Sequence, residues 1–573
     1  MRFSSGERAF ETLWQLWGGM TRPAVESCVD GLSGLPRRPP WSLTLRLLTS
    51  RSFAATLLAV GMIATPTVAI AHPQSLAPFE YVERELADVP VITDVDDLRV
   101  DIVRESDNVE FVAHVPVAPT SDMQFQRRIG SQRLKGEVVT GTRDILVMGG
   151  TQRPGLMTFD ITDPEKPELL ATVSCGGFHS DVAIYENYAI QAWDGTTRNC
   201  EVGDPANRNG VENAGNQGSK GLRIYDITDP ADPVMVARYG KAEGIPSGVH
   251  NITVNADAGL VYLNMAEFNA VNPPWGYVDM NDPELPVTIK SIRDWSPTAA
   301  DGCHDGGIAP TRELFACPGI TASYIWDISD PRNPTEVAYI PNPAISIHHG
   351  GRWTPDEQTL VLGDELAGAA AATPCSGGAN TVTPTGAAWF YNATVAEAPV
   401  LSGVFSTPDT DGDFCTTHFY GFQRDTTLMP MGMYDAGIEV VDYAAVADGL
   451  PGVPTSHAVF EPDESGFFSA YAWHGYVYGS SFEYGATRKN LEADGRGLWI
   501  IKVDGIEDNE PVATDEGATW GRWTDATSGV HLTIAARIGL APAEAHTNMP
   551  LYAIAGALVL LVSGVVRRRR AAA

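Results

Sequence analysis

Basic residues are scarce in this chain of 573 residues. There are 39 Lys and Arg against 71 Asp and Glu, which gives a formal net charge of -32. A surface that binds a phosphate backbone needs clustered Lys and Arg, so this balance argues against a nucleic-acid partner. The chain is otherwise of globular composition, with 44% hydrophobic and 9% aromatic residues, which excludes a disordered polymer.

Several catalytic signatures are also absent. The sequence contains no P-loop, no GxGxxG after a strand, no GxSxG and no HExxH. The body lacks any segment with convincing helical periodicity, and its strand-like runs are short. The common nucleotide-binding, serine-hydrolase and zinc-protease motifs are therefore excluded, and the pattern favours an all-β fold.

The N-terminal segment has the features of an export signal. Basic residues precede an apolar stretch over 53–64, and Ala69-Ile70-Ala71 then provides a small-residue cleavage pattern. We expect residues 1–71 to be a signal peptide, with a retained membrane anchor as the alternative. Residues 72–107 follow as an acidic lead-in.

The C-terminal segment predicts a membrane anchor. Residues 551–566 are apolar and uncharged, and four arginines follow at 567–570. An arginine block behind an apolar span keeps the tail on the cytoplasmic side. We expect a transmembrane helix with its arginine stop at 550–570, a stalk or linker at 506–549, and a body at the cell surface. Exchange of this tail for another anchor is the alternative.

Cysteines are few, and they agree with an exported body. Of the seven, Cys28 lies in the predicted signal and six remain. No CxxC pair exists, which disfavours thiolate metal ligation, and an even number in an exported protein predicts disulfides. Pairing between sequence neighbours would join Cys175 to Cys200, Cys303 to Cys317, and Cys375 to Cys415.

One phrase recurs along the body. It is clearest at Gly221, where a strand-like run ends in an Asp-Pro turn (GLRIYDITDPADP), and related phrases begin at Gly155, Gly276 and Ala322. Asp before Pro favours a tight reversal of the chain. Two further strand-like runs precede each phrase, which gives four strands per unit, as is typical of propeller blades.

Seven such units can be counted. We predict a single seven-bladed β-propeller over residues 108–505, with four antiparallel strands in each blade. The first unit is expected to begin near Arg133. The last unit ends after its third strand, and the lone strand from Asn108 is expected to supply the fourth and close the ring, which removes exposed strand edges.

The phrase at Gly221 resembles the LVIVD repeat of bacterial and archaeal surface proteins. The series GVHNITV, GCHDGGI and IHHGGRW, followed by VLGDELAG, resembles the choice-of-anchor B proteins, which carry one β-propeller and varied anchoring tails. The resemblance covers about residues 105–505 and implies a fold and a surface location, but no chemistry. The sequence departs from the family in the last unit, where Phe467, Phe468 and Ser469 replace a His-Asn pair.

Histidines recur at the start of the units. Aligning the innermost strands places four of them at one equivalent position: His250, His304, His348 and His418. His179 falls one residue off this register and His349 neighbours His348, so both are secondary candidates. Because innermost strands line the central channel of a propeller, these imidazoles should converge, and they could hold Zn, Fe or Cu.

Acidic residues run in step with the histidines and could orient metal-bound imidazoles or add oxygen ligands. The candidates are Asp194, Glu267, Asp305, Asp364, Glu365 and Asp435. Capping of turns is the alternative role for these side chains. A Ca²⁺ site on an acidic face is a further option, although no EF-hand-like spacing occurs.

The histidines also have an interpretation without metal. A repeated His–acid pair can form a hydrogen-bond network within each blade, which leaves the imidazoles neutral and satisfied. A general acid–base role without metal is a third interpretation. Geometry separates them, because ring nitrogens that meet near one point favour metal, whereas pairs that point into separate blades favour architecture.

Two functions remain from the sequence. The first is a membrane-anchored extracellular β-propeller that binds a protein, a glycan or a metal ion. The second is a secreted metal-dependent enzyme, an oxidoreductase or a hydrolase, with a histidine-ring metal centre in the channel. The cofactor, if there is one, is a divalent metal whose identity among Zn, Fe, Cu and Ca stays open.

Overall fold

The computed structural model describes most of the predicted propeller. The described residues are 89–151, 154–173, 179–193, 221–240, 243–246, 248–265, 272–281, 287–299, 301–365, 386–407, 416–463, 465–482 and 495–508. The predicted signal peptide, the transmembrane anchor and nearly all of the stalk lie outside these residues. Within them, no helix has the length and apolar character needed to cross a bilayer.

Strands dominate this part of the chain, which contains no α-helix. The strands form five four-stranded sheets, here called I to V, and one nine-stranded sheet. Each four-stranded sheet is antiparallel, and its strands are neighbours in chain order. The all-β prediction is therefore confirmed for the described residues. Three short 3-10 helices lie between strands: η2 (Val95–Asp97), η5 (Ile292–Asp294) and η7 (Ala447–Gly449).

The strands of sheets I to V follow one another along the chain. Sheet I contains β3 (Thr120–Leu134), β4 (Glu137–Gly150), β5 (Leu156–Asp160) and β6 (Glu168–Val173). Sheet II contains β7 (Val182–Tyr185), β8 (Tyr188–Trp193), β9 (Gly221–Asp226) and β10 (Val234–Tyr239). Sheet III contains β11 (Asn251–Asn255), β12 (Leu260–Asn264), β13 (Pro274–Asp279) and β14 (Val287–Ser291). Sheet IV contains β15 (Gly307–Ala309), β16 (Leu314–Pro318), β17 (Ser323–Asp327) and β18 (Thr335–Ile340). Sheet V contains β19 (His348–Trp353), β20 (Thr359–Asp364), β21 (Ala388–Asn392) and β22 (Val400–Phe405).

The nine-stranded sheet consists of two antiparallel groups joined by one parallel pair. The first group contains β23 (Phe419–Tyr420), β24 (Leu428–Gly432), β25 (Ile438–Asp442) and β26 (Thr455–Pro462), with β1 (Ile102–Glu105) at its outer edge. The second contains β27 (Gly466–Trp473), β28 (Tyr476–Phe482), β29 (Gly497–Val503) and β2 (Val109–Pro116). The parallel pair is β23 with β27.

Strand β2 completes the last group, as the sequence predicts. It pairs antiparallel with β29, from Val109 opposite Val503 to Pro116 opposite Gly497. The start of the body is thereby hydrogen-bonded to its end. Strand β1, which falls in the range expected to be the acidic lead-in, pairs with β26 in the same way.

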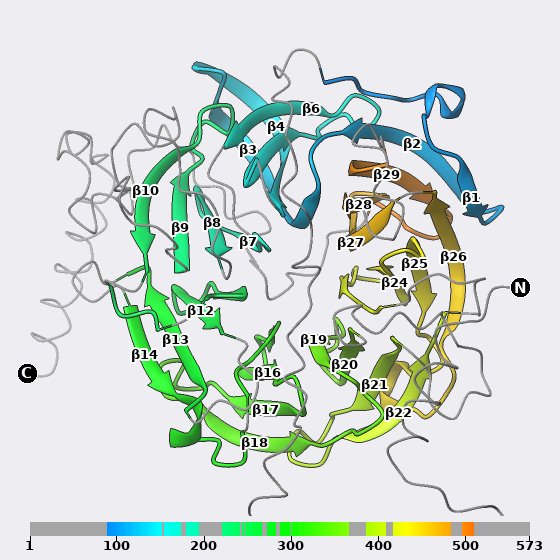
Figure 1. The fold of residues 1–573 in the computed structure, drawn as a ribbon. Coiled ribbons are helices and arrows are strands. Elements are labelled where there is room, and N and C mark those ends of the chain that lie inside the picture. The colour runs from blue at the N-terminus through cyan, green and yellow to red at the C-terminus, as the bar shows by residue number, and fades with distance from the viewer. Residues whose placement is uncertain are drawn as a thin grey trace, which may run out of the picture. The chain divides into compact units, whose positions relative to one another are not determined.

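The sheets radiate from a common centre (Figure 1). Their first strands contact one another in turn, β3 with β7, β7 with β11, β11 with β15, and β15 with β19, and β27 contacts both β23 and β3. The fourth strands, such as β10, β14, β18 and β22, lie at the rim in Figure 1. This arrangement is a β-propeller, with the first strand of each sheet lining the central channel.

Apolar side chains fill the spaces between neighbouring sheets. One cluster joins Val147 and Leu156 of sheet I to Val182 and Trp193 of sheet II. Equivalent clusters join sheet II to III, III to IV and IV to V. Both faces of the inner strands are buried as a result, so all six residues of β8 are buried and the strand has no polar face.

The first sheet begins earlier than the sequence predicts. Strand β3 starts at Thr120 rather than near Arg133, because buried polar residues hide its alternation. Gln126 donates from Nε2 to the carbonyl oxygen of Glu186 (2.6 Å), and Arg128 donates from Nη2 to that of Ile227 (2.9 Å). These buried positions hold polar side chains that hydrogen-bond to sheet II. The sequence of the strand therefore resembles that of a polar linker.

The leading glycine of the repeated phrase has a geometric cause. Gly221 has a φ of 139°, and a Cβ built on it would lie 1.9 Å from the carbonyl oxygen of Tyr239 on the fourth strand. Gly497 repeats this arrangement, with a φ of 121° and a 2.2 Å approach to the carbonyl oxygen of Val115. Only glycine combines this backbone conformation with so close an approach.

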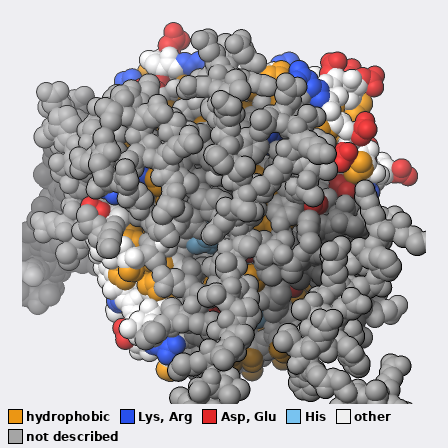
Figure 2. Space-filling model, in the orientation of Figure 1, with side chains coloured by type: hydrophobic (Ala, Val, Ile, Leu, Met, Phe, Trp, Pro, Cys, Tyr) orange, Lys and Arg blue, Asp and Glu red, His pale blue; other side chains and the backbone are white. Residues whose placement is uncertain are grey.

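Acidic side chains gather at one edge of the propeller. In Figure 2 they cluster at the upper right, where Figure 1 places β1 and the chain leading into it. The exposed acids there are Asp94, Asp96, Asp97, Asp101, Glu105, Asp107 and Glu110. This edge carries part of the negative charge that argues against a nucleic-acid partner.

Replacing Gly221 should destabilise the propeller more than replacing a glycine of the same conformation in open space. Gly141 has a φ of 141°, and no atom lies within 4 Å of a Cβ built on it. Both Ala variants strain the backbone, but only Gly221→Ala also forces a clash between adjacent strands. We expect Gly221→Ala to lower the free energy of unfolding by about 1–3 kcal/mol more than Gly141→Ala, as measured by urea unfolding. Equal losses would mean that backbone conformation alone selects this glycine.

Candidate metal centre in the channel

Five histidines and one phenylalanine form a continuous ring of aromatic side chains around the channel. We call His179, His250, His304, His349 and His418 the histidine ring. Consecutive ring centroids are 4.0, 4.2, 4.3 and 4.3 Å apart along this order. Phe468 closes the circle, 4.1 Å from His418 and 5.1 Å from His179. Of the four histidines expected to converge, His250, His304 and His418 lie in this ring, and the secondary candidates His179 and His349 join them.

Each member lies on or just before the first strand of a different antiparallel group, and the groups of His418 and Phe468 share the nine-stranded sheet. His250 and His418 directly precede the first strands β11 and β23, and His349 is the second residue of β19. Phe468 lies in β27, in the unit where the sequence lacks a histidine. All five histidines are 0–4% exposed. The aromatic ring thus results from equivalent positions on successive sheets.

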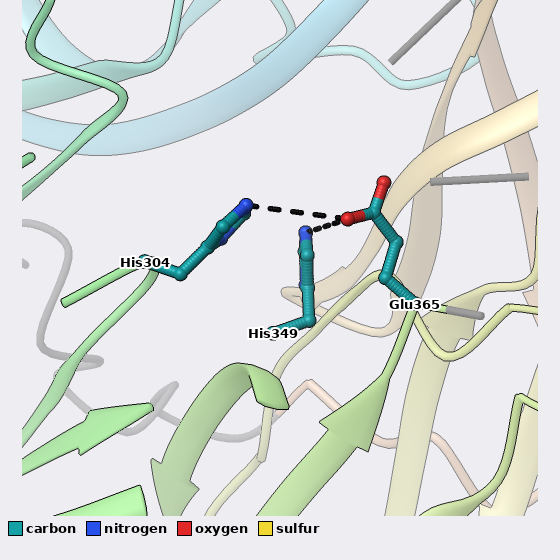
Figure 3. Close-up of side chains that lie close together, drawn as sticks. All are labelled: His304, His349 and Glu365. Carbon is teal, nitrogen blue, oxygen red and sulfur yellow. Dashed lines mark ion pairs between the residues drawn. The ribbon is translucent and has the colours of Figure 1, made fainter. Parts of the chain in front are cut away.

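Glu365 lies against three members of the histidine ring. It follows β20 directly and is fully buried. Its Oε2 is 3.6 Å from Nε2 of His349 and 4.0 Å from Nε2 of His304 (Figure 3). Ligand atoms of His304, His349 and Glu365 all lie within 4.8 Å of one another, which is the spacing of side chains around a metal ion.

His418 faces the other carboxylate oxygen of Glu365. Its Nε2 is 3.9 Å from Oε1. Its Nδ1 donates to the carbonyl oxygen of Phe468 at 2.7 Å, which fixes the proton on Nδ1 and directs the lone pair of Nε2 toward the carboxylate. Metal-binding histidines commonly donate their second ring N–H to a backbone carbonyl in this way. His418 therefore presents Nε2 to the same carboxylate, although it is not part of the group formed by His304, His349 and Glu365.

Tyr434 orients the carboxylate. Its hydroxyl donates to Oε1 of Glu365 at 3.0 Å, and its ring stacks on His418 at 4.8 Å. Tyr434 adopts a φ of 48°, which is rare for a bulky residue, and a pair of backbone hydrogen bonds to Phe467 holds it there. No spacing rule marks this tyrosine in the sequence.

Burial sets the protonation of the centre. It raises the pKa of Glu365 to about 8, and nearby Asp364 adds to the effect. Burial also lowers the pKa of His250 to about 3, and it lowers the pKa values of His304 and His418 well below the usual range, helped by the neighbouring imidazoles. The imidazoles of His250, His304 and His418 are therefore neutral at pH 7, which is the form that binds metal.

His348, one of the four leading candidates, lies apart from this group. Its Nδ1 accepts from the hydroxyl of Ser323 at 2.8 Å, and its Nε2 donates to the carbonyl oxygen of Asn342 at 3.2 Å. Both ring nitrogens are thus hydrogen-bonded between sheets IV and V, which is a structural role, although the partners are a hydroxyl and a carbonyl rather than the expected acid. His349 takes the channel position, because adjacent residues of a strand face opposite ways.

The other acidic candidates are dispersed. Asp364 accepts from the backbone N–H groups of Ser346 (2.9 Å) and Ile347 (3.1 Å), which caps the turn before β19. Asp305 forms an ion pair with Arg352 at 2.9 Å and does not belong to the group around Glu365. Asp435 is half-buried in the turn after β24 and does not belong to the three-residue group. Asp194 and Glu267 lie outside the described residues.

A disulfide flanks the centre. Cys303 is bonded to Cys317, as pairing between sequence neighbours predicts, and it directly precedes His304. The bond ties the approach to β15 to the adjacent strand β16 and restricts the backbone that carries this imidazole. The remaining cysteine candidates, Cys175, Cys200, Cys375 and Cys415, lie outside the described residues.

Comparison with known proteins supports a repeat-built chain. The family model described as the LVIVD repeat matches residues 217–240, which include β9 and the Asp-Pro turn. A search of curated proteins gave no match. The protein is thus a repeat β-propeller, whose assignment rests on the matched repeat and on the strand pairing itself.

Solved structures with similarity to the chain have low sequence identity. Hydrazine synthase of Kuenenia stuttgartiensis is 10% identical, with a TM-score of 0.41 over 63% of this chain and 93% of that one. A functionally unknown protein from Desulfotomaculum acetoxidans is 10% identical, with a TM-score of 0.37 over 61% of this chain and 93% of that one. The WD40 repeats of RRP9 are 9% identical, with a TM-score of 0.39 over 68% of this chain and 99% of that one.

Glu365→Gln should flatten the pH dependence of stability in the metal-free protein. The pKa of Glu365 is about 8 when folded, against an ordinary value of 4.5. Between these values the native state holds a proton that the unfolded state has released, so wild-type stability falls as the pH rises. We expect the wild type to lose more unfolding free energy than the variant between about pH 5 and pH 8, measured by urea unfolding. Other buried acids titrate in both proteins, so their contributions cancel in the comparison. Parallel plots of unfolding free energy against pH for the wild type and the variant would contradict the raised pKa of Glu365.

Proposed function

We propose that this protein is a surface-exposed β-propeller that binds a transition-metal ion in its central channel. The observation that carries the proposal is the placement of ligand atoms of His304, His349 and Glu365 within 4.8 Å of one another. These residues come from two different sheets and are 0–1% exposed. A buried carboxylate beside neutral imidazoles is costly without a counter-charge, and a bound cation supplies one.

The donor set selects the class of metal. Imidazole nitrogens suit Zn, Fe and Cu, and one carboxylate is compatible with Zn or Fe. His418 offers a further nitrogen from the opposite side of the same carboxylate, 3.9 Å from Oε1. The hard cations Ca²⁺ and Mg²⁺ prefer sites built only of oxygen, so this centre disfavours them.

A metal-dependent enzyme is the second candidate function. Two histidines and one carboxylate form the ligand set that leaves coordination positions open in non-haem iron oxygenases and in zinc hydrolases. An oxidoreductase or a hydrolase would use such an open position. The identity of the bound metal separates these chemistries from a purely structural or binding role.

The architecture around the centre is part of the same proposal. We infer seven blades, taking the two antiparallel groups of the nine-stranded sheet as two blades beside sheets I to V. The likeness of the histidine-bearing segments to choice-of-anchor B proteins supports a cell-surface role. In that setting the propeller is expected to contact an extracellular protein or glycan, and its acidity argues against nucleic acid.

Export and anchoring are testable by fractionation. The basic-flanked apolar segment before residue 72 and the arginine stop at 567–570 support a body outside the membrane. We expect the full chain in the membrane fraction, accessible to protease from outside, and a chain lacking residues 550–570 to be released. A full chain recovered from the cytosol, or a truncated chain that stays membrane-bound, would contradict the anchor.

Metal content tests the centre directly. The full chain, purified in mild detergent without chelator, should contain about one transition-metal ion per chain by elemental analysis. His349→Ala and Glu365→Gln should each lower this content at least about tenfold, because each removes a ligand. Iron or copper would direct assays toward oxidoreductase activity, and zinc toward hydrolysis.

The adjacent residue provides the matched control. His348→Ala should keep the metal, because both nitrogens of His348 are already hydrogen-bonded to Ser323 and Asn342. Circular dichroism establishes that the variants are folded. A folded wild type without metal, or His349→Ala with wild-type content, would overturn the proposal.

A further inference from the structure

A second polar layer lies directly beyond the histidine ring, on the same inner segments. Asn251 and Asp305 each follow a ring histidine by one residue, and Asp181 follows His179 by two. Asp122 lies near the start of β3, in the sheet that gives the ring no aromatic side chain. We call Asp122, Asp181, Asn251 and Asp305 the acidic layer. Its members are 0–1% exposed and come from sheets I to IV.

Asp122 and Asp181 are each held in place by a hydrogen bond to one carboxylate oxygen. Asp122 accepts from the hydroxyl of Tyr471 at 2.8 Å through Oδ1, and Asp181 accepts from the backbone N–H of Ile252 at 2.7 Å through Oδ2. Asp122 also interacts with the side chain of Ser469 and the backbone N–H of Met123. Oδ1 of Asp181 has no hydrogen-bond partner in the described part of the chain. Buried carboxylate oxygens are ordinarily satisfied, so this oxygen indicates a missing ligand.

Asn251 gives independent evidence. Its amide is fully buried, and neither Oδ1 nor Nδ2 has a hydrogen-bond partner among the described residues. Asn251 shares a face of β11 with Thr253, whose hydroxyl donates to the carbonyl oxygen of Gly306 at 2.9 Å. The amide is therefore aimed toward the segment that carries Asp305, and Asp181 is bonded to the next residue along, Ile252.

The charges of the layer do not balance. Asp122, Asp181 and Asp305 face one cation, Arg352, which is 1% exposed and pairs with Asp305 at 2.9 Å. Three carboxylates against one guanidinium leave two negative charges buried away from water. Burial, with mutual repulsion, raises the pKa of Asp181 well above its usual range. A divalent cation would offset both charges and let the carboxylates stay ionised.

We propose that the acidic layer binds one Ca²⁺ ion through oxygens of Asp122, Asp181 and Asn251, with water completing its coordination. Calcium accepts six to eight oxygen ligands, including amide carbonyls and water, in flexible geometry, which suits donors spread over sheets I to III. Asp305 holds Arg352 beside the ion. This site shares no ligand with the imidazole centre and does not depend on it.

Calcium binding to the full chain tests the proposal. The wild type, stripped with EGTA and assayed at about pH 8, should bind one more Ca²⁺ than Asp181→Asn by isothermal titration, with a Tm raised by about 2–6 °C in Ca²⁺. Asn251→Asp adds a carboxylate, so it should bind Ca²⁺ about tenfold more tightly than the wild type. That gain cannot arise from misfolding.

Controls separate this site from the others. Glu365→Gln should lose transition metal but keep its Ca²⁺, whereas Asp181→Asn should do the reverse, so the two sites fail independently. Calcium bound equally by the wild type and Asp181→Asn would belong to the acidic surface and would overturn the proposal. So would an Asn251→Asp variant whose affinity for Ca²⁺ matches that of the wild type.

Discussion

The meeting of first strands at one axis is the constraint on which the rest of this structure depends. Each sheet packs apolar side chains against its neighbours, and the first strands bring their buried polar side chains together in the channel. Equivalent positions on successive sheets then face one another at about 4 Å, as the consecutive imidazoles do. Side chains that would be isolated on a single sheet become a ring.

That crowding determines the chemistry of the channel. Water is excluded, so imidazoles lose their protons and Glu365 holds on to its own. The histidine ring provides nitrogen donors, and the layer beyond it provides oxygen donors, on adjacent levels of the same strands. Donor type therefore changes along the channel within one or two residues of each strand, and the two proposed sites would accordingly prefer different classes of metal.

Much of the architecture could be predicted because each repeat contains the sequence signals for its own strands and turns. The Asp-Pro turn, the leading glycine and the lone strand from Asn108 are local signals with direct structural causes. The predicted start of sheet I was wrong by more than ten residues. Gln126 and Arg128 are buried because they hydrogen-bond to sheet II, so the strand lacks the alternation of apolar and polar residues that would identify it. The blade positions of the histidines could be predicted, but the choice between His348 and His349 could not. It depends on which neighbour faces the channel, and a bulge in the pairing of β19 with β20 shifts that register.

The contribution of Tyr434 lay beyond sequence reasoning for a related reason. It reaches Glu365 from a turn between strands of another sheet, in a backbone conformation that no composition rule marks. Long-range contacts of this kind depend on how the sheets are placed around the axis, and that placement is decided by the whole core.

The pairing of β2 with β29 also has a consequence for the order of synthesis. Strand β2 is made before the five four-stranded sheets, but its partner β29 is the last of the described strands to be made. During synthesis, the early sheets can fold against one another while β2 keeps its hydrogen-bonding edge unsatisfied. The chain therefore remains an open, edge-exposed intermediate until almost the whole body has been made. Such an intermediate is slow to complete and prone to aggregate, because a strand edge stays exposed until the last pairing forms.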